Sequence, residues 1–192
     1  MHTIGPIVRL QIQRSPLKIG EKPNRRYVTD PILAVQRVRI EPDGIVASHQ
    51  GVEVIDVHHR GHPATRNDAG QNGLSVGFTS HYRAMEERFG DHMVLGCAGE
   101  NLIVHTDRVI TLDELAGGVT ILDAAGRTKL SLSGVQVAVP CRPFAGFALK
   151  GRRVEAEVMK DTLQFLHDGL RGFYGIIDGI AEVAVGDVLA TG

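Results

Sequence analysis

The chain of 192 residues lacks tryptophan and is poor in aromatic side chains, which make up 5% of it. It has two cysteines, Cys97 and Cys141, too few for the disulfide framework of a small secreted domain. No apolar run reaches the roughly 18 residues of a membrane-spanning helix, and the first residues lack the basic and apolar regions of a secretory signal. We therefore expect a cytoplasmic protein without membrane association.

A strong excess of either charge is also missing. The sequence has 21 lysines and arginines against 22 aspartates and glutamates, for a net charge of −1. This balance lacks the basic footprint of a nucleic-acid-binding protein, so we predict no nucleic-acid partner. The phosphate-binding loop, the dinucleotide fingerprint, the Cys-x-x-Cys motif and the Gly-x-Ser-x-Gly elbow are absent as well.

Glycine is abundant, with 23 residues, or about 12% where about 7% is usual. Tight turns rich in glycine separate short β-like segments, and Glu-Pro-Asp-Gly at 41–44 and Asp-Ala-Ala-Gly at 123–126 predict hairpins. The predicted strands cover residues 7–13, 33–40, 45–46, 52–57, 119–122, 128–139, 180–185 and 188–190. This pattern predicts a mostly β fold, a β-barrel with small helical excursions, in a single domain over residues 1–192.

An irregularity interrupts the segment 128–139. Its leucines occupy even positions before Gly134, and its valines occupy odd positions after it. A slip of one residue would turn the later side chains to the wrong face, so we predict a β-bulge near Gly134. Helices are predicted over 80–89 and 162–170 from apolar residues at helical spacing. The stretches 20–31 and 60–73 are predicted to be surface loops.

Residues 58–63, His-His-Arg-Gly-His-Pro, form the densest imidazole cluster of the chain. His58 and His62 have the i, i+4 spacing of a helical zinc site, but Gly61 and Pro63 oppose a helix there. The cluster is typical of a polar loop after a strand. A loop that contacts a ligand and a closed metal site are the alternatives.

The two cysteines lie in different surroundings. Cys141 stands between Pro140 and Arg142, and a neighbouring guanidinium favours the thiolate, which is the nucleophilic and metal-binding form. A purely structural Cys141 is the alternative, because cysteine is often buried. Cys97 lies among small residues, and we expect it to pack.

Polar residues elsewhere carry weaker signals. Glu100 and Asn101 precede an apolar segment, where their side chains are typical of hydrogen bonds that tie loops together. Two basic clusters are typical of a solvated surface, with a site for a phosphate-bearing ligand as the alternative. They contain Lys150, Arg152 and Arg153 in one case and Arg25 and Arg26 in the other.

Four segments in this order resemble motifs of MOSC domains, the family named after the C-terminal domain of molybdenum cofactor sulfurases. Residues 56–61 resemble its GD-x-H-x-G turn, and residues 99–102 match GENL. Val-Pro-Cys at 139–141 and Gly-Asp-Val at 186–188 match its Pro-Cys element and its terminal GD-x-V. The resemblance is clearest over residues 44–192. In many family members the cysteine follows the second proline of P-R-x-P-C, whereas here it lies three residues earlier.

The resemblance implies a distorted β-barrel similar to the pyruvate-kinase β-barrel domain, with a cysteine in a pocket. By this resemblance Cys141 is the expected catalytic residue and molybdenum ligand. The residues expected to bind the molybdenum cofactor (molybdopterin) are His58, His59, Arg60, Arg66, Glu100, Asn101 and Arg142. Lys150 is a further candidate for its phosphate.

Three functions follow as hypotheses. In the first, the protein carries sulfur or binds molybdenum cofactor: Cys141 accepts sulfane sulfur as a persulfide from a cysteine desulfurase, or ligates molybdenum. In the second, it is a molybdenum-cofactor-dependent reductase of N-hydroxylated compounds that works with a separate electron-donor protein. In the third, it is a non-catalytic module that binds a small ligand while Cys141 packs. Pyridoxal phosphate is not expected to act in this chain, because no lysine stands in a recognisable Schiff-base context.

Overall fold

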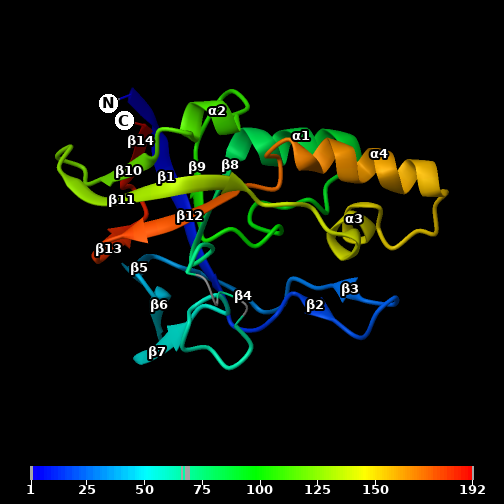
Figure 1. Ribbon diagram of the computed structural model, residues 1–192, viewed down its shortest axis with the longest axis horizontal. Helices are drawn as coiled ribbons and strands as arrows, with labels where there is room; N and C mark the ends of the chain where they lie inside the picture. The colour runs from blue at the N-terminus through cyan, green and yellow to red at the C-terminus, as the bar shows by residue number, and fades with distance from the viewer. Residues whose placement is uncertain (1, 66, 68–69, 192) are drawn as a thin grey trace.

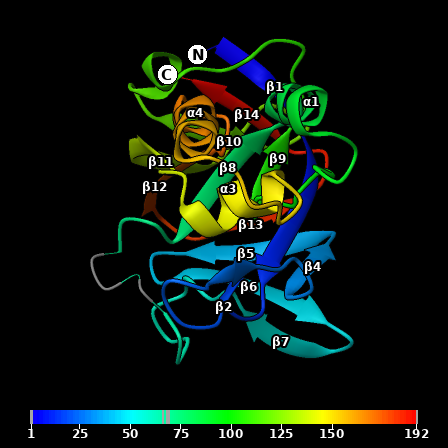
Figure 2. The same cartoon turned by 90° about the vertical axis from the view of Figure 1, so that its right-hand side faces the viewer.

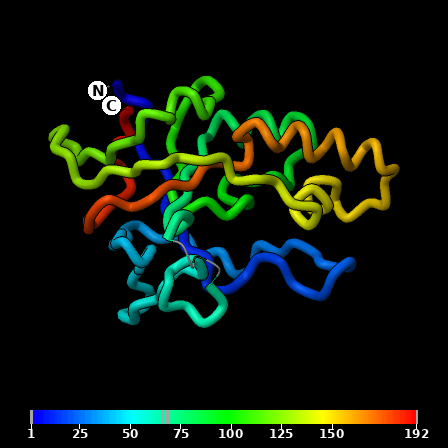
Figure 3. Tube along the Cα trace, viewed as in Figure 1, coloured from blue at the N-terminus to red at the C-terminus, as the bar shows by residue number. Residues whose placement is uncertain are grey.

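A seven-stranded barrel forms the centre of the molecule in the computed structural model, which describes residues 2–65, 67 and 70–191 (Figure 1). In spatial order its strands are β14 (Val188–Thr191), β10 (Val119–Leu122), β11 (Thr128–Val137), β12 (Phe173–Asp178), β8 (Leu74–Phe78), β9 (Leu102–Val104) and β1 (His2–Gln13). Pairing of β1 with β14 closes the barrel and brings the two ends of the chain together, as Figure 3 shows. The predicted mostly β fold with a barrel is confirmed.

A smaller antiparallel sheet lies beside the barrel (Figure 2). Its strands are β13 (Ala181–Ala184), β5 (Arg37–Glu41), β6 (Gly44–His49) and β7 (Val52–Ile55). The hairpin predicted at 41–44 joins β5 to β6, and the one predicted at 123–126 joins β10 to β11. Strand β4 (Ile32–Val35) pairs with the far end of β1.

The segment 20–31, predicted to be a plain loop, contributes to a two-stranded ribbon of β2 (Lys18–Ile19) and β3 (Arg26–Tyr27). The sequence did not predict β3, because Pro23 and Asn24 are turn residues and each strand of the ribbon has only two paired residues. This ribbon extends away from the barrel in Figure 1.

The predicted bulge near Gly134 is confirmed. The register between β11 and β12 shifts between Ser133 and Gln136, and Gly134 has a φ of 57°, a conformation that glycine adopts without steric cost. After the bulge the chain runs on from β11 toward the helices, where Cys141 lies.

The part of the chain that the structure describes also contains four helices: α1 (Thr79–Phe89), α2 (Leu112–Leu115), α3 (Arg142–Ala148) and α4 (Ala156–His167). Helix α1 confirms the prediction over 80–89. Helix α4 begins six residues before the predicted 162–170 and ends at His167, where Gly169 and Gly172 take positive φ. Helices α2 and α3 were not predicted. No helix among the described residues is long and apolar enough to cross a membrane.

Two apolar clusters stabilise this arrangement. Aliphatic side chains and Phe78 and Phe173 fill the barrel. A second cluster lies between the helices and the barrel, and Phe144 of α3 and Met85 of α1 are wholly buried in it. Cys97 belongs to this second cluster and is 2% exposed, as expected for a packing residue.

Candidate functional site

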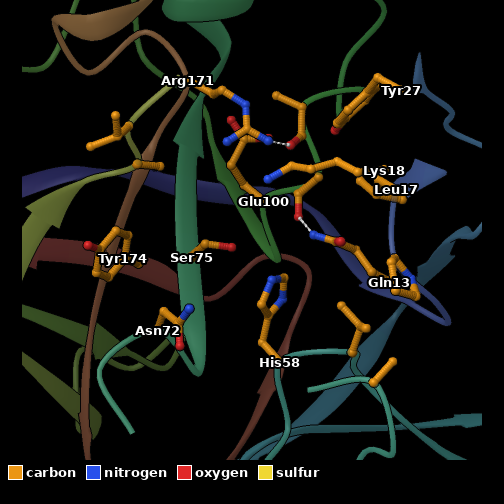
Figure 4. Close-up of a pocket in the computed structure, with 17 residues that line it drawn as sticks. Gln13, Leu17, Lys18, Tyr27, His58, Asn72, Ser75, Glu100, Arg171 and Tyr174 are labelled. Carbon is orange, nitrogen blue, oxygen red and sulfur yellow. Dashed lines mark hydrogen bonds between the residues drawn. The ribbon is translucent and has the colours of Figure 1, made fainter. Parts of the chain in front are cut away.

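An open cavity of about 240 Å³ lies where several distant segments meet (Figure 4). This is somewhat below the ~300–1,000 Å³ typical of pockets for drug-sized ligands, so it accommodates a small ligand or one end of a larger one. Several polar side chains of the cavity wall come from the end of β1, from β2, from the loop after β7, from β8 and from the segments before β9 and β12. They are Gln13, Lys18, His58, Ser75, Glu100 and Arg171.

Arg171 supplies a positive charge to the cavity. Its Nη2 donates to the Ala98 carbonyl at 3.0 Å, and the guanidinium carbon lies 4.7 Å from the centre of the Phe144 ring. Its Nε is buried and has no hydrogen-bond partner among the described residues. Burial lowers the pKa of Arg171, but nearby Tyr27 and other groups raise it above its ordinary value. Arg171 therefore remains a cation whose buried Nε–H has no partner among the described residues, and its charge favours an anionic ligand.

Glu100 is the buried carboxyl group of the cavity, with 3% of the residue exposed. The Tyr82 hydroxyl donates to its Oε2, while its Oε1 has no partner among the described residues. Burial raises the pKa of Glu100 above its usual range, although Tyr82 and Arg171 act in the opposite direction. Glu100 thus keeps its proton to a higher pH than an exposed glutamate.

Close backbone approach makes room for this carboxyl group. A Cβ at Gly77 would lie 2.8 Å from Glu100 Oε1, and one at Gly172 would lie 2.8 Å from its Cγ. Real Cβ contacts are almost never that short, so glycine at both positions lets β8 and the segment just before β12 close around Glu100.

His58 faces the cavity from the loop after β7 and is backed by Asp56. Its Nδ1 lies 3.0 Å from Asp56 Oδ1, and its backbone N–H donates to the same oxygen at 2.8 Å. Asp56 is wholly buried. In Figure 4 the His58 ring points into the cavity.

Asn101 braces the site from behind. Its Nδ2 donates to Asp56 Oδ2 at 3.0 Å and to the Gln11 carbonyl at 3.2 Å. Its Oδ1 accepts from the backbone and the hydroxyl of Ser75. One amide thus ties β1, β8 and the His58 loop together, which is the loop-tying role expected for this pair of residues, while Glu100 provides the cavity wall.

His59 and Arg60, both expected at the cofactor, lie against the β5–β6 hairpin. His59 Nε2 is 3.0 Å from Glu41 Oε1, and Arg60 pairs with Asp43 at 3.5 Å. Gly44 passes so close to His59 that a Cβ there would lie 2.6 Å from its Cα. Neither side chain lines the described cavity.

The other expected residues are distributed differently. Arg142 is exposed at the first position of α3, and Lys150 pairs with Asp91 at 3.6 Å. Arg66 lies outside the described residues. His62 bonds to backbone groups through both ring nitrogens, at Arg14 and Ala64. No group of three metal-ligating side chains occurs among the described residues.

Cys141 lies between β11 and α3 and is half-buried. It packs at the edge of the second apolar cluster, and its thiol is near enough to Arg171 to raise the pKa of that guanidinium. Ala138 and Val139, just before it, line the cavity, whereas Cys141 is not itself in the described wall. Arg171 therefore lines the cavity and also lies near the thiol of Cys141.

Sequence reasoning missed Arg171, Lys18 and Tyr82 as site residues. Arg171 lies in the short turn between α4 and β12, and Tyr82 reads as one of the apolar positions of α1. The approach of Arg171 and Tyr82 to Glu100 depends on contacts between distant segments, and the spacing of the residues carries no signal for it.

No family model and no curated protein matches this chain. Solved structures do. The YuaD protein from Bacillus subtilis superposes with a TM-score of 0.56 at 13% identity, over 96% of this chain and 93% of that one. YiiM from Geobacillus stearothermophilus gives 0.52 at 16% identity, over 97% and 74%. A hypothetical protein gives 0.54 at 12% identity, over 97% and 68%.

The chain is similar in fold to YuaD and YiiM, which are MOSC-like proteins. At these identities the likeness concerns the fold alone, and it agrees with the barrel that the motifs implied.

Proposed function

We propose that this chain is a MOSC-type protein that binds an anionic cofactor of the molybdopterin class in the cavity, with Cys141 beside it as a thiolate ligand of molybdenum. The observation that carries this proposal is Arg171, a cation at the cavity with a buried, unused N–H. A buried donor without a partner costs about 1–3 kcal/mol, and the positive charge of Arg171 at the cavity favours an anionic ligand.

The residues present fit such a group. Arg171 and Lys18 supply positive charge for a phosphate or another anionic part. Ser75, Asn72 and Tyr174 add the polar edge groups that a heterocycle rich in N–H and C=O requires. When bound, the cofactor would supply a redox-active molybdenum centre.

Cys141 is the better of the two thiols for this role. It is half-buried, at the edge of the second apolar cluster, and lies near the cationic Arg171. Cys97, in contrast, is buried, and burial raises its pKa to about 12, so it stays protonated at neutral pH. The chain thus offers one accessible thiol beside the cavity.

The position of Cys141 near Arg171 also supports a sulfur-carrier function. In that reaction the Cys141 thiolate attacks the outer sulfur of a persulfide on a cysteine desulfurase. A new S–S bond forms, the donor S–S bond breaks, and the desulfurase cysteine leaves as a thiolate. The Arg171 guanidinium then stabilises the persulfide anion on Cys141.

The experiment compares wild type, Cys141→Ser and the control Cys97→Ser, each purified from a host that makes molybdopterin. We expect wild type and Cys97→Ser to retain molybdenum and pterin. We expect Cys141→Ser to keep the pterin but to show one sulfur fewer around molybdenum by X-ray absorption. Identical molybdenum coordination in all three would mean that Cys141 only packs.

The sulfur-carrier function is tested separately. Wild type is incubated with a cysteine desulfurase and cysteine, and its intact mass is measured. A gain of one sulfur atom that Cys141→Ser abolishes supports the persulfide, and an unchanged mass in wild type contradicts it.

A further inference from the structure

We propose that His58 and Asp56 form an acid–base pair at the cavity, in which His58 Nε2 takes a proton from the bound ligand and returns it. Asp56 is the positioning residue of the pair. The inference rests on the proposed function only in that a ligand occupies the same cavity. It adds a proton-transferring group that neither the motif resemblance nor the similarity of fold assigns.

The geometry around Asp56 carries this inference. Its carboxylate is wholly buried and accepts four hydrogen bonds. Oδ2 accepts from the Gln13 backbone N–H at 2.7 Å and from Asn101 Nδ2 at 3.0 Å. Oδ1 accepts from the His58 backbone N–H at 2.8 Å and faces His58 Nδ1 at 3.0 Å. The fixed orientation of Asp56 therefore fixes the ring of His58.

This contact selects one tautomer of the ring. A carboxylate only accepts hydrogen bonds, so His58 Nδ1 must carry a proton to bond with Asp56. In the neutral ring the other nitrogen, Nε2, then keeps its lone pair and can accept a proton. The His58 side chain is 32% exposed, and its ring points into the cavity in Figure 4. The basic nitrogen of the pair is thus the one that can meet a ligand.

The charges around the cavity explain why the pair needs Asp56. Lys18 and Arg171 line the same cavity, and both oppose a second positive charge on His58. Glu100 also lines it, but burial raises its pKa and favours its neutral form. His59 and Arg60, on the same loop, pair with the β5–β6 hairpin. Asp56 is therefore the anion in direct contact with the ring, and it stabilises the imidazolium that forms.

The proton step is balanced without any further reagent. An N–H or O–H bond of the ligand breaks as its proton moves to His58 Nε2, and the electron pair stays on the ligand. Asp56 holds Nδ1–H throughout and does not change its protonation. The imidazolium then returns the Nε2 proton to the product or to water.

Long-range ¹H–¹⁵N NMR spectra of the labelled protein above neutral pH test the tautomer directly. We expect His58 as the Nδ1–H form. His62 is an internal control, because the Ala64 N–H donates to its Nδ1 and so requires the Nε2–H form. Asp56→Asn should convert His58 to the ordinary Nε2–H form. His58 in the Nε2–H form in wild type would overturn the proposal.

Asp56→Asn replaces one carboxylate oxygen with an amide nitrogen, leaves the two donors at that oxygen without an acceptor and can fail to fold, so a second measurement uses the wild-type chain. Diethyl pyrocarbonate modifies free imidazole nitrogens. We expect it to modify His58 in the cofactor-free protein, and to do so at least tenfold more slowly in protein loaded with molybdopterin. Buried His81, with both nitrogens bonded, should stay unmodified. Equal modification of His58 in both forms would contradict the proposal.

Turnover separates this inference from the proposed function. If loaded protein reduces N-hydroxylated compounds, His58→Gln should lower that turnover per bound molybdenum about 10²–10⁴-fold, as for the loss of a general acid–base group. Unchanged turnover would overturn the acid–base role and leave the cofactor proposal standing. Loss of molybdenum from wild type would refute the cofactor proposal, whereas the tautomer of His58 tests the pair by itself.

Discussion

His81 makes the stability of this protein depend on pH in a way that can be calculated from the structure. The residue lies on α1 and is wholly buried. Its Nδ1 is 3.0 Å from the Gly169 carbonyl, and its Nε2 accepts from the Ile110 N–H at 3.0 Å. Both nitrogens are used in the neutral ring. Burial lowers the pKa of His81 to about 4, although the Gly169 contact acts in the opposite direction.

The magnitude follows from the difference between the folded and unfolded states. The unfolded chain binds a proton at His81 below a pKa of about 6.5, whereas the folded chain does so only below about 4. Between these values, lowering the pH favours the unfolded state. Because a tenfold change in proton affinity is about 1.4 kcal/mol, the loss reaches about 2 kcal/mol by pH 5 and about 3 kcal/mol below pH 4. The full contribution is present above pH 6.5.

The assay is urea unfolding of wild type and His81→Gln at several pH values from 7.5 to 5. The variant should be less stable at pH 7.5 by about 1–3 kcal/mol, because one buried partner is left unsatisfied. Since glutamine does not titrate, the stability difference between the two proteins should shrink by about 2 kcal/mol at pH 5. His105→Gln, at an exposed position, is the control and should follow wild type. A stability difference between wild type and His81→Gln that does not change with pH would contradict the lowered pKa of His81.

Three further predictions concern the surroundings of the cavity. Gly77→Ala should destabilise the fold by about 1–3 kcal/mol in urea unfolding, because its Cβ would press on the buried carboxyl group, whereas Gly117→Ala, with open space around it, should change stability by less than about 1 kcal/mol. Asn101→Ala should cost about 2–4 kcal/mol, because several buried partners lose their hydrogen bonds; an effect below about 1 kcal/mol would contradict the bracing role. Iodoacetamide at pH 8 should label Cys141 in the folded protein and leave Cys97 unlabelled, as peptide mass spectrometry would show, because a thiol of pKa about 12 is almost entirely protonated there. Labelling of Cys97 at a similar rate would contradict its burial.

Local sequence patterns predicted part of the β structure, but not strands β8 and β12 of the barrel or the β2–β3 ribbon. The change of parity at Gly134 predicted the bulge because strand side chains alternate strictly, and the turn residues at 41–44 and 123–126 predicted two hairpins. Helix α3 was not predicted because its seven residues are too few to show a helical period. Pro143 in its first turn was the available signal, since proline is common there.

The candidate site was only partly predictable. The motif resemblance placed His58 and Glu100, and both line the cavity. The resemblance also placed His59 at the cofactor. In the structure His59 follows His58 in a turn, faces another direction and contacts Glu41. Arg171 carries no local signal, because its role comes from burial and from neighbours distant in sequence.

Whether the cavity binds molybdopterin is decided by the molybdenum and pterin content of the wild-type protein purified from a host that makes molybdopterin. Binding at Arg171 and Lys18 predicts close to one molybdenum and one pterin per chain after gel filtration. In Lys18→Gln, which loses one exposed positive charge of the cavity, we expect less of both. Wild-type protein free of molybdenum and pterin, from cells in which a molybdoenzyme is loaded, would contradict the account.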